Sequence, residues 1–197
     1  MNKNLNVKDL INVGLFTVLI FIFIFIGGMI GFIPVLMPIV PFVGGLLAGP
    51  VSMLFATKIK TRGMLLIEQL IIAILFVVMG HGPGMLLTAL AGGMLGEILL
   101  KKGSYCSVKH ARLAFTVAAL SGIGNWLPIF FARDKYIDQM LQMGYGQVYA
   151  AKMMSVLPNW SLAPITLLGM LGTYLGCTIG ITILKKHFVK AGMTKEV

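Results

Sequence analysis

Charged side chains are scarce in this sequence, and acidic ones are the rarest. Only 11% of its 197 residues are Asp, Glu, Lys or Arg, whereas a soluble domain carries roughly 25%. Just six of them are acidic, and no two carboxylates are expected at one level of the fold. The shortage of acids argues against enzymes that act through paired carboxylates.

Catalytic and nucleotide-binding motifs are also missing. The sequence contains no HExxH, no Walker A loop and no G-x-S-x-G, so we predict that the chain is not an enzyme and cannot drive transport with ATP by itself. Its two cysteines, Cys106 and Cys177, are far apart and match no metal or disulfide spacing. Cys177 lies in an apolar run and is expected to be a small packing residue. No cofactor is expected.

Apolar residues make up the rest of the chain: 58% are hydrophobic and the mean hydropathy is +0.94. So much apolar surface cannot be buried inside one small globule, so lipid must be its solvent. We therefore predict a single integral membrane domain over residues 1–197. The first apolar run is too long for a signal peptide, and no A-x-A-like cleavage site follows it, which favours a retained membrane helix.

Six segments have about the 20 residues needed to cross a bilayer, and they predict an all-α bundle of six transmembrane helices. The spans are about 10–30, 34–57, 63–80, 84–100, 112–132 and 161–184. The second span contains Pro34, Pro38, Pro41 and Pro50, which predicts a partly non-helical entry covered by protein or facing a water-filled cavity. The short third and fourth spans are joined by "GHGPG", residues 80–84.

The basic residues give the orientation. If the N-terminus is cytoplasmic, every Lys and Arg except Arg133, Lys135 and Lys152 lies on the cytoplasmic side, as the positive-inside rule requires. This also explains the high pI without any nucleic-acid partner. We expect both termini in the cytoplasm of a prokaryotic cell, the chain in its cell membrane, and "GHGPG" outside.

The outer connection at about 133–160 is long. Tyr136, Ile137, Met140 and Leu141 occur at helical spacing, which predicts a short amphipathic helix over the mouth of the bundle. Two interpretations stay open, an ordinary interfacial helix and a mobile lid. The lid is favoured by Gly144 and Gly146, since they flank Tyr145 and supply a hinge.

Polar and aromatic residues gather at the predicted outer level. Asn125 and Trp126 end one span, and Asn159 and Trp160 begin the next. Each Trp can be an interfacial anchor, but two Asn-Trp pairs beside the lid candidate also suit a pocket for a small, planar, partly polar molecule. Tyr145 and His81 lie at this level, and the glycines around His81 would let a ligand approach the backbone. The alternative for His81 is a solvated loop residue.

Glu68 and Glu97 are the only acids inside spans. Both are expected near the cytoplasmic ends, Glu97 within pairing distance of Lys101, so we favour structural or partner-docking roles for them. Gly-x-x-x-Gly spacings recur and predict close helix packing, within the bundle or against a partner. They are Gly27/Gly31, Gly45/Gly49, Gly92/Gly96 and Gly172/Gly176/Gly180.

Three segments carry a family resemblance: "NVKDLINVGLFTVLIFIFIFIGGMIG", "IPVLMPIVPFVGGLLAGPVSMLFATKIKTRG" and "GGMLGEIL". With them the chain resembles the substrate-binding S components of energy-coupling factor (ECF) transporters, and among these the Trep_Strep, or MptD-like, group. The resemblance implies six helices with both termini inside and capture of a micronutrient near the outer surface. It also implies delivery through a transmembrane coupling subunit and two cytoplasmic ATPases.

The resemblance also implies positions for contacts. S components often meet the coupling subunit through an Ala-x-x-x-Ala ridge on the first helix. This chain departs from that pattern, and Gly14 with Thr17 is what remains of it. Ligand contacts from the outer loops and last three helices would include the six outer residues already selected: His81, Asn125, Trp126, Tyr145, Asn159 and Trp160.

Three functions therefore compete. The first is an S component that binds a vitamin, a precursor or a similar nutrient; haem is a minor variant, with His81 or a nearby methionine as axial ligand. The second is a self-sufficient secondary permease or channel, in which Glu68 would couple an ion. The third is a membrane scaffold without a ligand, which would have a dry, well-packed outer bundle.

Overall fold

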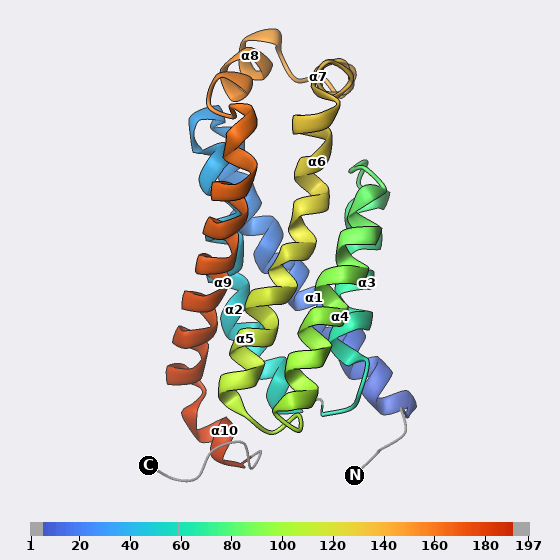
Figure 1. Ribbon diagram of the computed structural model, residues 1–197, viewed down its shortest axis with the longest axis vertical. Coiled ribbons are helices and arrows are strands. Elements are labelled where there is room, and N and C mark those ends of the chain that lie inside the picture. Colours follow the sequence, from blue (N-terminus) through green and yellow to red (C-terminus); the bar gives the residue numbers. More distant parts are fainter. Residues whose placement is uncertain (1–5, 59, 191–197) are drawn as a thin grey trace.

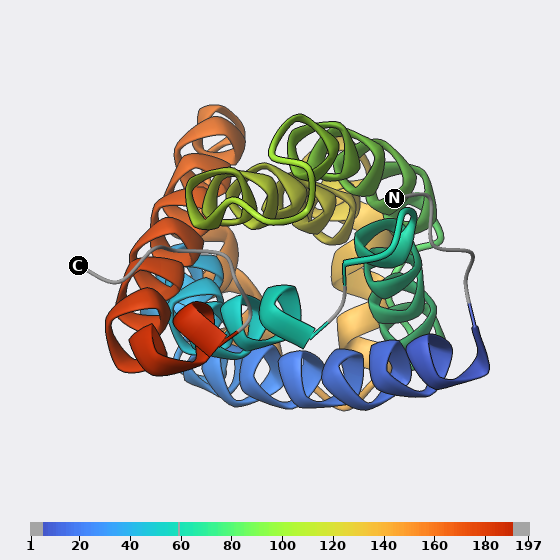
Figure 2. The ribbon, with the colours of Figure 1, turned by 90° about the horizontal axis from the view of Figure 1, so that it is seen from below.

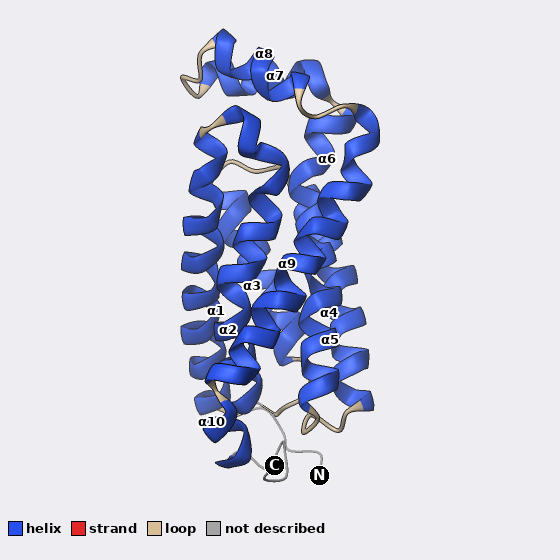
Figure 3. Ribbon diagram, turned by 90° about the vertical axis from the view of Figure 1, so that its left-hand side faces the viewer, coloured by secondary structure: helices blue, strands red, loops and turns tan. Residues whose placement is uncertain are grey.

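The computed structural model describes residues 6–58 and 60–190, and every regular element in this part of the chain is a helix (Figures 1 and 3). This confirms the predicted all-helical class. The long helices are α1 (Val7–Gly28), α2 (Val40–Lys58), α3 (Met64–Val78), α4 (Gly84–Lys102), α5 (Val108–Ala118), α6 (Ile123–Phe131) and α9 (Leu162–Ile183). Helices α7 (Arg133–Gln142) and α8 (Gln147–Ser155) cover one end, and α10 (Lys185–Lys190) lies at the other.

The long helices form a closed ring. Neighbours in contact run in the order α1, α2, α9, α5, α4 and α3, and α3 returns to α1; Figure 2 shows this ring from the end opposite α7 and α8. Helix α6 extends α5 beyond the 3₁₀ turn Ala119–Gly122 (η3). Because α1 begins and α9 ends at the same end of the bundle (Figure 1), the arrangement is the one that an even number of crossings produces.

Within residues 6–58 and 60–190, five helical segments are long and apolar enough to cross a membrane. They are Val7–Phe32, Pro34–Lys58, Gly84–Lys102, Val108–Phe131 and Asn159–Ile183. The third predicted span, 63–80, is short as expected: α3 has 15 residues and is about 22 Å long, less than the roughly 30 Å of the hydrocarbon layer. Its limits are set by Gly63 and Gly80, whose positive φ values of 88° and 95° turn the chain out of the helix.

The prolines shape the entry to α2. Residues Met29–Phe32 (η1) and Pro34–Ile39 (η2) form 3₁₀ turns, and only after them does the chain become α-helical. Pro41 lies in the first turn of α2, where its missing N–H leaves no hydrogen bond unmade. The predicted irregular entry is therefore present as two 3₁₀ turns broken at Ile33, and it forms part of the wall of a cavity.

The glycine spacings bring helices of this chain together. A Cβ atom on Gly45 would lie 2.7 Å from the Thr173 nitrogen of α9, and one on Gly180 would lie 2.6 Å from Cα of Pro50 in α2. A Cβ on Gly27 would meet Gly44 in the same way, at 2.6 Å. These contacts explain why α2 can pack closely on both α1 and α9.

Three phenylalanines from three helices close the centre of the ring. Phe55 of α2 packs edge-on against Phe16 of α1 and Phe115 of α5, with ring centroids 5.9 and 6.0 Å apart. All three side chains are buried. We call them the phenylalanine floor, because the large cavity described below lies on their outer side and ends at Phe115.

Glu97 has a structural role, as predicted, but with other partners than Lys101. Its Oε1 accepts a hydrogen bond from the backbone N–H of Leu65 at 2.8 Å, and its Oε2 accepts one from the Tyr105 hydroxyl at 3.0 Å. The carboxylate thereby satisfies a free N–H group in the first turn of α3, where negative charge is favourable.

Candidate functional site

A cavity of about 550 Å³ occupies the half of the ring nearer α7 and α8, within the 300–1,000 Å³ usual for small-molecule sites. It reaches from α7 and α8 down to Ser52, Glu68 and Phe115 at mid-depth. Its polar side chains come from most of the surrounding helices and include Ser52, Glu68, Gln69, His81, Ser121, Asn125, Tyr136, Gln139, Tyr145, Tyr149 and Thr173. A scaffold without a ligand would not be expected to leave such a space.

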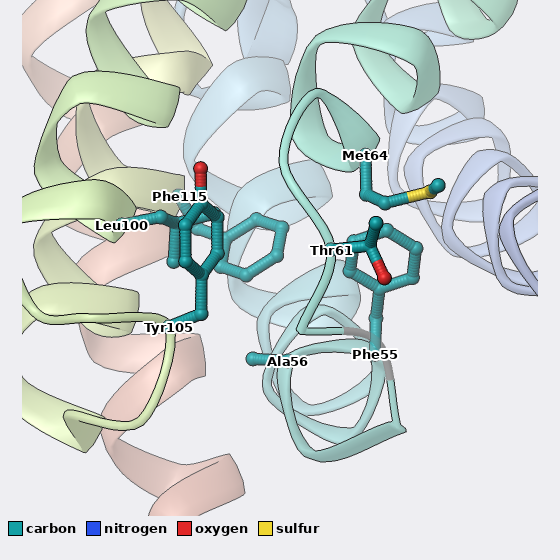
Figure 4. Close-up of a pocket in the computed structure, with 7 residues that line it drawn as sticks. All are labelled: Phe55, Ala56, Thr61, Met64, Leu100, Tyr105 and Phe115. Atoms are coloured by element: carbon teal, nitrogen blue, oxygen red, sulfur yellow. The ribbon is translucent and has the colours of Figure 1, made fainter. Parts of the chain in front are cut away.

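A second pocket near the opposite end is far smaller. Its volume is about 10 Å³, room for one water molecule at most. Figure 4 shows the residues around it: Phe55, Ala56, Thr61, Met64, Leu100, Tyr105 and Phe115. Phe115, one ring of the phenylalanine floor, borders both spaces, and Phe55, a second ring, borders the smaller one.

Four of the six predicted ligand residues line the large cavity: His81, Asn125, Trp126 and Tyr145. Asn159 and Trp160 do not. The 3₁₀ turn Asn159–Ser161 (η4) directs both outward, and Trp160 is 73% exposed while Ser161 is buried. The structure thus brings only the first Asn-Trp pair into the cavity, and Trp160 has the exposure expected of an interfacial anchor.

His81 is held in a fixed orientation at the cavity edge. Its Nδ1 lies 3.1 Å from the carbonyl oxygen of Phe76, so Nδ1 carries the proton and donates, because a carbonyl can only accept. The imidazole also packs edge-on against the Phe76 ring, with centroids 5.1 Å apart. Burial lowers the pKa of His81 below its usual 6.5, against the opposing effect of that hydrogen bond. The neutral ring leaves Nε2 as a free acceptor.

Asn125 and Trp126 come from α6, which approaches α4 closely because residue 124 is glycine. A Cβ at Gly124 would lie 2.8 Å from the Met85 nitrogen. Trp126 is 8% exposed. The Oδ1 atom of Asn125 is buried and has no hydrogen-bond partner among the residues described, which leaves this amide available to a ligand.

The deepest polar group, around Glu68, is the part of the site that sequence reasoning missed. Glu68 is 1% exposed, and the Gln69 amide donates to its Oε2 at 2.7 Å. The Ser121 hydroxyl donates to Oε1 of Gln69 at 2.5 Å, and Thr88 donates to the Ser121 carbonyl at 2.7 Å. This chain of hydrogen bonds links α3, α4 and η3 at the bottom of the cavity.

The predicted location of Glu68 near the cytoplasmic end is wrong. Gly93, halfway along α4, packs against Leu66 and Gln69, which puts this turn of α3 at mid-depth. The helix starts only at Met64, so few residues separate its first turn from the cavity. The signal that could have located the site was the polar pair Glu68-Gln69 inside an otherwise apolar run, since intramembrane acids are rare and usually functional.

Methionines form much of the cavity wall. Half of the 14 in the chain line it: Met29, Met37, Met79, Met85, Met140, Met143 and Met153. Their flexible thioethers can adjust to the outline of a guest and pack against aromatic rings. Within the described parts of the chain, no three His, Cys, Asp or Glu side chains are grouped to hold a metal ion.

The predicted amphipathic segment is two helices, α7 and α8, with a turn at Gly144, whose φ is 89°. We call these helices the outer cap. The Gln139 amide donates to the Gly80 carbonyl at 3.0 Å, and the Tyr149 hydroxyl donates to the Gly31 carbonyl at 2.5 Å. The cap is thus joined to the α3–α4 turn and to η1. Burial in this cluster raises the pKa of Tyr136 to about 12.

The two residues proposed for partner contact differ in exposure. Thr17 is fully buried inside the bundle, so its side chain is not on the outer face of α1. Gly14 is partly exposed, and a Cβ there would meet nothing within 4 Å. Only Gly14 therefore remains available for a contact outside this chain.

The described residues form a helical ring that has five apolar segments long enough to cross a membrane and, at one end, a largely apolar cavity with some polar side chains. These features define the class, an integral membrane protein. The family model described as "Hypothetical bacterial integral membrane protein (Trep_Strep)" matches residues 7–190. The chain belongs to this family, as its sequence predicted. A search of curated proteins and a search of solved structures gave no match.

Proposed function

We propose that this protein is the substrate-capturing S component of an ECF-type importer. It binds a small micronutrient in the cavity and performs no catalysis. A separate coupling subunit and two cytoplasmic ATPases then supply the energy for delivery. The observation that carries the proposal is the cavity of about 550 Å³ beneath a hydrogen-bonded cap, in a chain without a nucleotide-binding motif.

The distribution of charge supports an outward-facing cavity in a prokaryotic cytoplasmic membrane. Lys101, Lys102 and Lys109 lie at the end of the bundle opposite the outer cap, at the α4–α5 connection (Figure 1). Positive residues favour the cytoplasmic side, which supports a cap on the outside. Lys3 and Lys195, which contribute to the same prediction, fall outside the described residues.

Six crossings require α3 to span the bilayer despite its length. The helix closes the ring between α1 and α4, so two of its sides meet other helices of the protein. A short helix in such a position is accommodated by local thinning of the bilayer, at a cost of fractions of a kcal/mol per Å. This arrangement keeps both termini in the cytoplasm.

One observation favours the alternative of a self-sufficient permease. Glu68 is a buried acid at mid-depth, where ion-coupled transporters place proton- or cation-binding groups. Against a continuous pathway stand the buried rings of the phenylalanine floor, one of which, Phe115, borders both the cavity and the pocket nearer the other end.

Reconstitution distinguishes the two functions. The small molecule that co-purifies with the chain in mild detergent is identified by mass spectrometry and then offered in labelled form to liposomes. We expect the chain alone to bind it without transport, and uptake to require the coupling module and ATP. Uptake by the chain alone, abolished in Glu68→Gln, would establish the permease instead.

A further inference from the structure

The described side chains that line the cavity include an acidic group but no lysine or arginine. Glu68 is its one acidic side chain, and the lining contains no Lys or Arg within the described residues. His81 also lines it, but burial lowers the pKa of this imidazole and so favours its neutral form. A ligand therefore meets a single group able to carry a full charge, and that charge is negative.

The carboxylate of Glu68 also has fewer hydrogen bonds than a buried carboxylate needs. Its Oε2 accepts one hydrogen bond from Gln69, and among the described residues no group donates to its Oε1. A carboxylate that is 1% exposed pays a large desolvation penalty unless it is paired. The carboxylate is therefore poised to accept a hydrogen bond, and a positive charge, from a guest.

The wall above Glu68 fits an aromatic or apolar body. Phe76, Trp126 and Tyr136 line the cavity, and their ring faces attract cations as well as apolar surface. The flexible methionines fill the space between such a body and the helices. Apart from Glu68, the polar side chains are neutral hydroxyls, amides, phenols and the imidazole.

We propose that the cavity takes a small monocation, an aromatic or apolar molecule with one protonated nitrogen, and that this nitrogen binds Oε1 of Glu68. The inference rests on the proposed function for its biological meaning and goes further by assigning the substrate class. It disfavours phosphorylated nutrients and dicarboxylates, since these would bring negative charge to a site without a cationic partner.

The test uses three probes with the same body, 4-phenylbutylammonium, 4-phenylbutanol and 4-phenylbutanoate. The chain has two tryptophans, and Trp160 lies outside the cavity, so Trp160→Phe leaves Trp126 as the only reporter. Binding is measured by Trp126 emission in lipid nanodiscs, with empty nanodiscs as the blank. The quantity compared is the Kd of the alcohol divided by the Kd of the ammonium.

We expect this ratio to be at least tenfold in Trp160→Phe, about 1.4 kcal/mol in binding free energy, and the carboxylate probe to bind most weakly. Adding Glu68→Gln, which keeps an acceptor for Gln69 and removes the charge, should bring the ratio near one. Glu68→Asp should restore part of it. Asp138→Asn on the exposed surface of α7 removes a charge elsewhere and should leave the ratio unchanged.

An unchanged ratio in Glu68→Gln, tighter binding of the alcohol or the carboxylate, or no response of Trp126 to any probe would overturn the inference. Circular dichroism of each variant shows that the fold is retained. The proposed function is decided separately by the uptake experiment with the coupling module. A neutral or anionic nutrient transported only with that module would refute the charge assignment and leave the S component standing.

Discussion

The hydroxyl of Tyr149 donates a hydrogen bond to the carbonyl oxygen of Gly31, at 2.5 Å, across 118 positions of the chain. It joins the outer cap to the 3₁₀ turn that follows α1. The hydrogen bond from the Gln139 amide to the Gly80 carbonyl joins the cap to the α3–α4 turn, on the other side of the cavity. The cap is thus fastened on two sides of the cavity by single hydrogen bonds, each typically worth about 1 kcal/mol.

Removing the Tyr149 hydroxyl should loosen the cap. We expect Tyr149→Phe to raise amide hydrogen exchange several-fold across residues 133–155 and to speed dissociation of the bound ligand. The reason is that losing this hydrogen bond lowers the free energy needed to open the cap by about 1 kcal/mol. Ser155→Ala is the matched control, since its hydroxyl bonds only to Lys152 within α8. Equal exchange in both variants would mean that this bond does not hold the cap.

Trp126 and Trp160 should differ in their effect on affinity. Trp126→Leu removes a cavity-lining indole that is 8% exposed and should weaken binding of the co-purifying molecule by at least tenfold, as buried aromatic anchors typically do. Trp160→Phe should change the Kd less than twofold. Unchanged affinity in both variants would assign both indoles to the membrane interface.

Helix packing through glycine gives a prediction on stability. Gly45→Ala forces a methyl group to within 2.7 Å of the Thr173 nitrogen and should lower the melting temperature in detergent, with about 1–3 kcal/mol lost to overpacking. Gly14→Ala is the control, because nothing lies within 4 Å of the new Cβ. Replacing a helical glycine there should stabilise α1 by about 0.5–1 kcal/mol. A melting temperature for Gly45→Ala at or above wild type would contradict this packing.

His81 should make stability depend on pH. Its folded-state pKa lies below the usual 6.5 because of burial, so below pH 6.5 the unfolded chain binds more protons and stability is lost. The loss continues until the folded-state pKa is passed. We expect the melting temperature to fall between pH 7.5 and pH 5.5, and His81→Gln to reduce that fall. The same pH dependence in wild type and variant would show that His81 does not contribute.

Assembly with a coupling subunit should distinguish the two positions of α1. Gly14→Leu puts a bulky side chain on the exposed face and is expected to prevent co-purification of the complex. Thr17→Val should leave assembly intact, because Thr17 is buried. That variant should also have a slightly higher melting temperature. The buried Thr17 Oγ1 has no hydrogen-bond partner among the described residues, so replacing it with a methyl group removes the cost of burying an unpaired hydroxyl. Loss of assembly in Thr17→Val alone would reverse the assignment.

Composition and hydrophobic run lengths were enough to predict the membrane class and the helical fold, because lipid imposes its length and polarity on any spanning segment. The prolines of the second span predicted the irregular entry to α2. Run length also predicted the third span, 63–80, closely, since α3 runs from Met64 to Val78 between Gly63 and Gly80, both with positive φ angles.

The candidate site was harder to predict from the sequence. The level of a residue along the bundle and the direction in which its side chain faces both depend on how the helices pack. Asn125 and Asn159 stand beside tryptophans in the same way, yet the 3₁₀ turn before α9 points one pair outward. Glu68 was assigned by its distance from Arg62 along the chain, whereas contact with the middle of α4 determines its level. Spacing in the sequence cannot report which helix comes to lie beside it.

The phenylalanine floor has a consequence for how cargo is unloaded. Its three rings belong to α1, α2 and α5, so rotating one side chain does not open a passage, and separating the helices would break the glycine contacts that hold the ring together. If the protein is the importer proposed above, a guest that cannot pass this floor leaves by the side on which it entered. Delivery to the cell interior would then require the whole body to turn over in the bilayer with its internal packing intact.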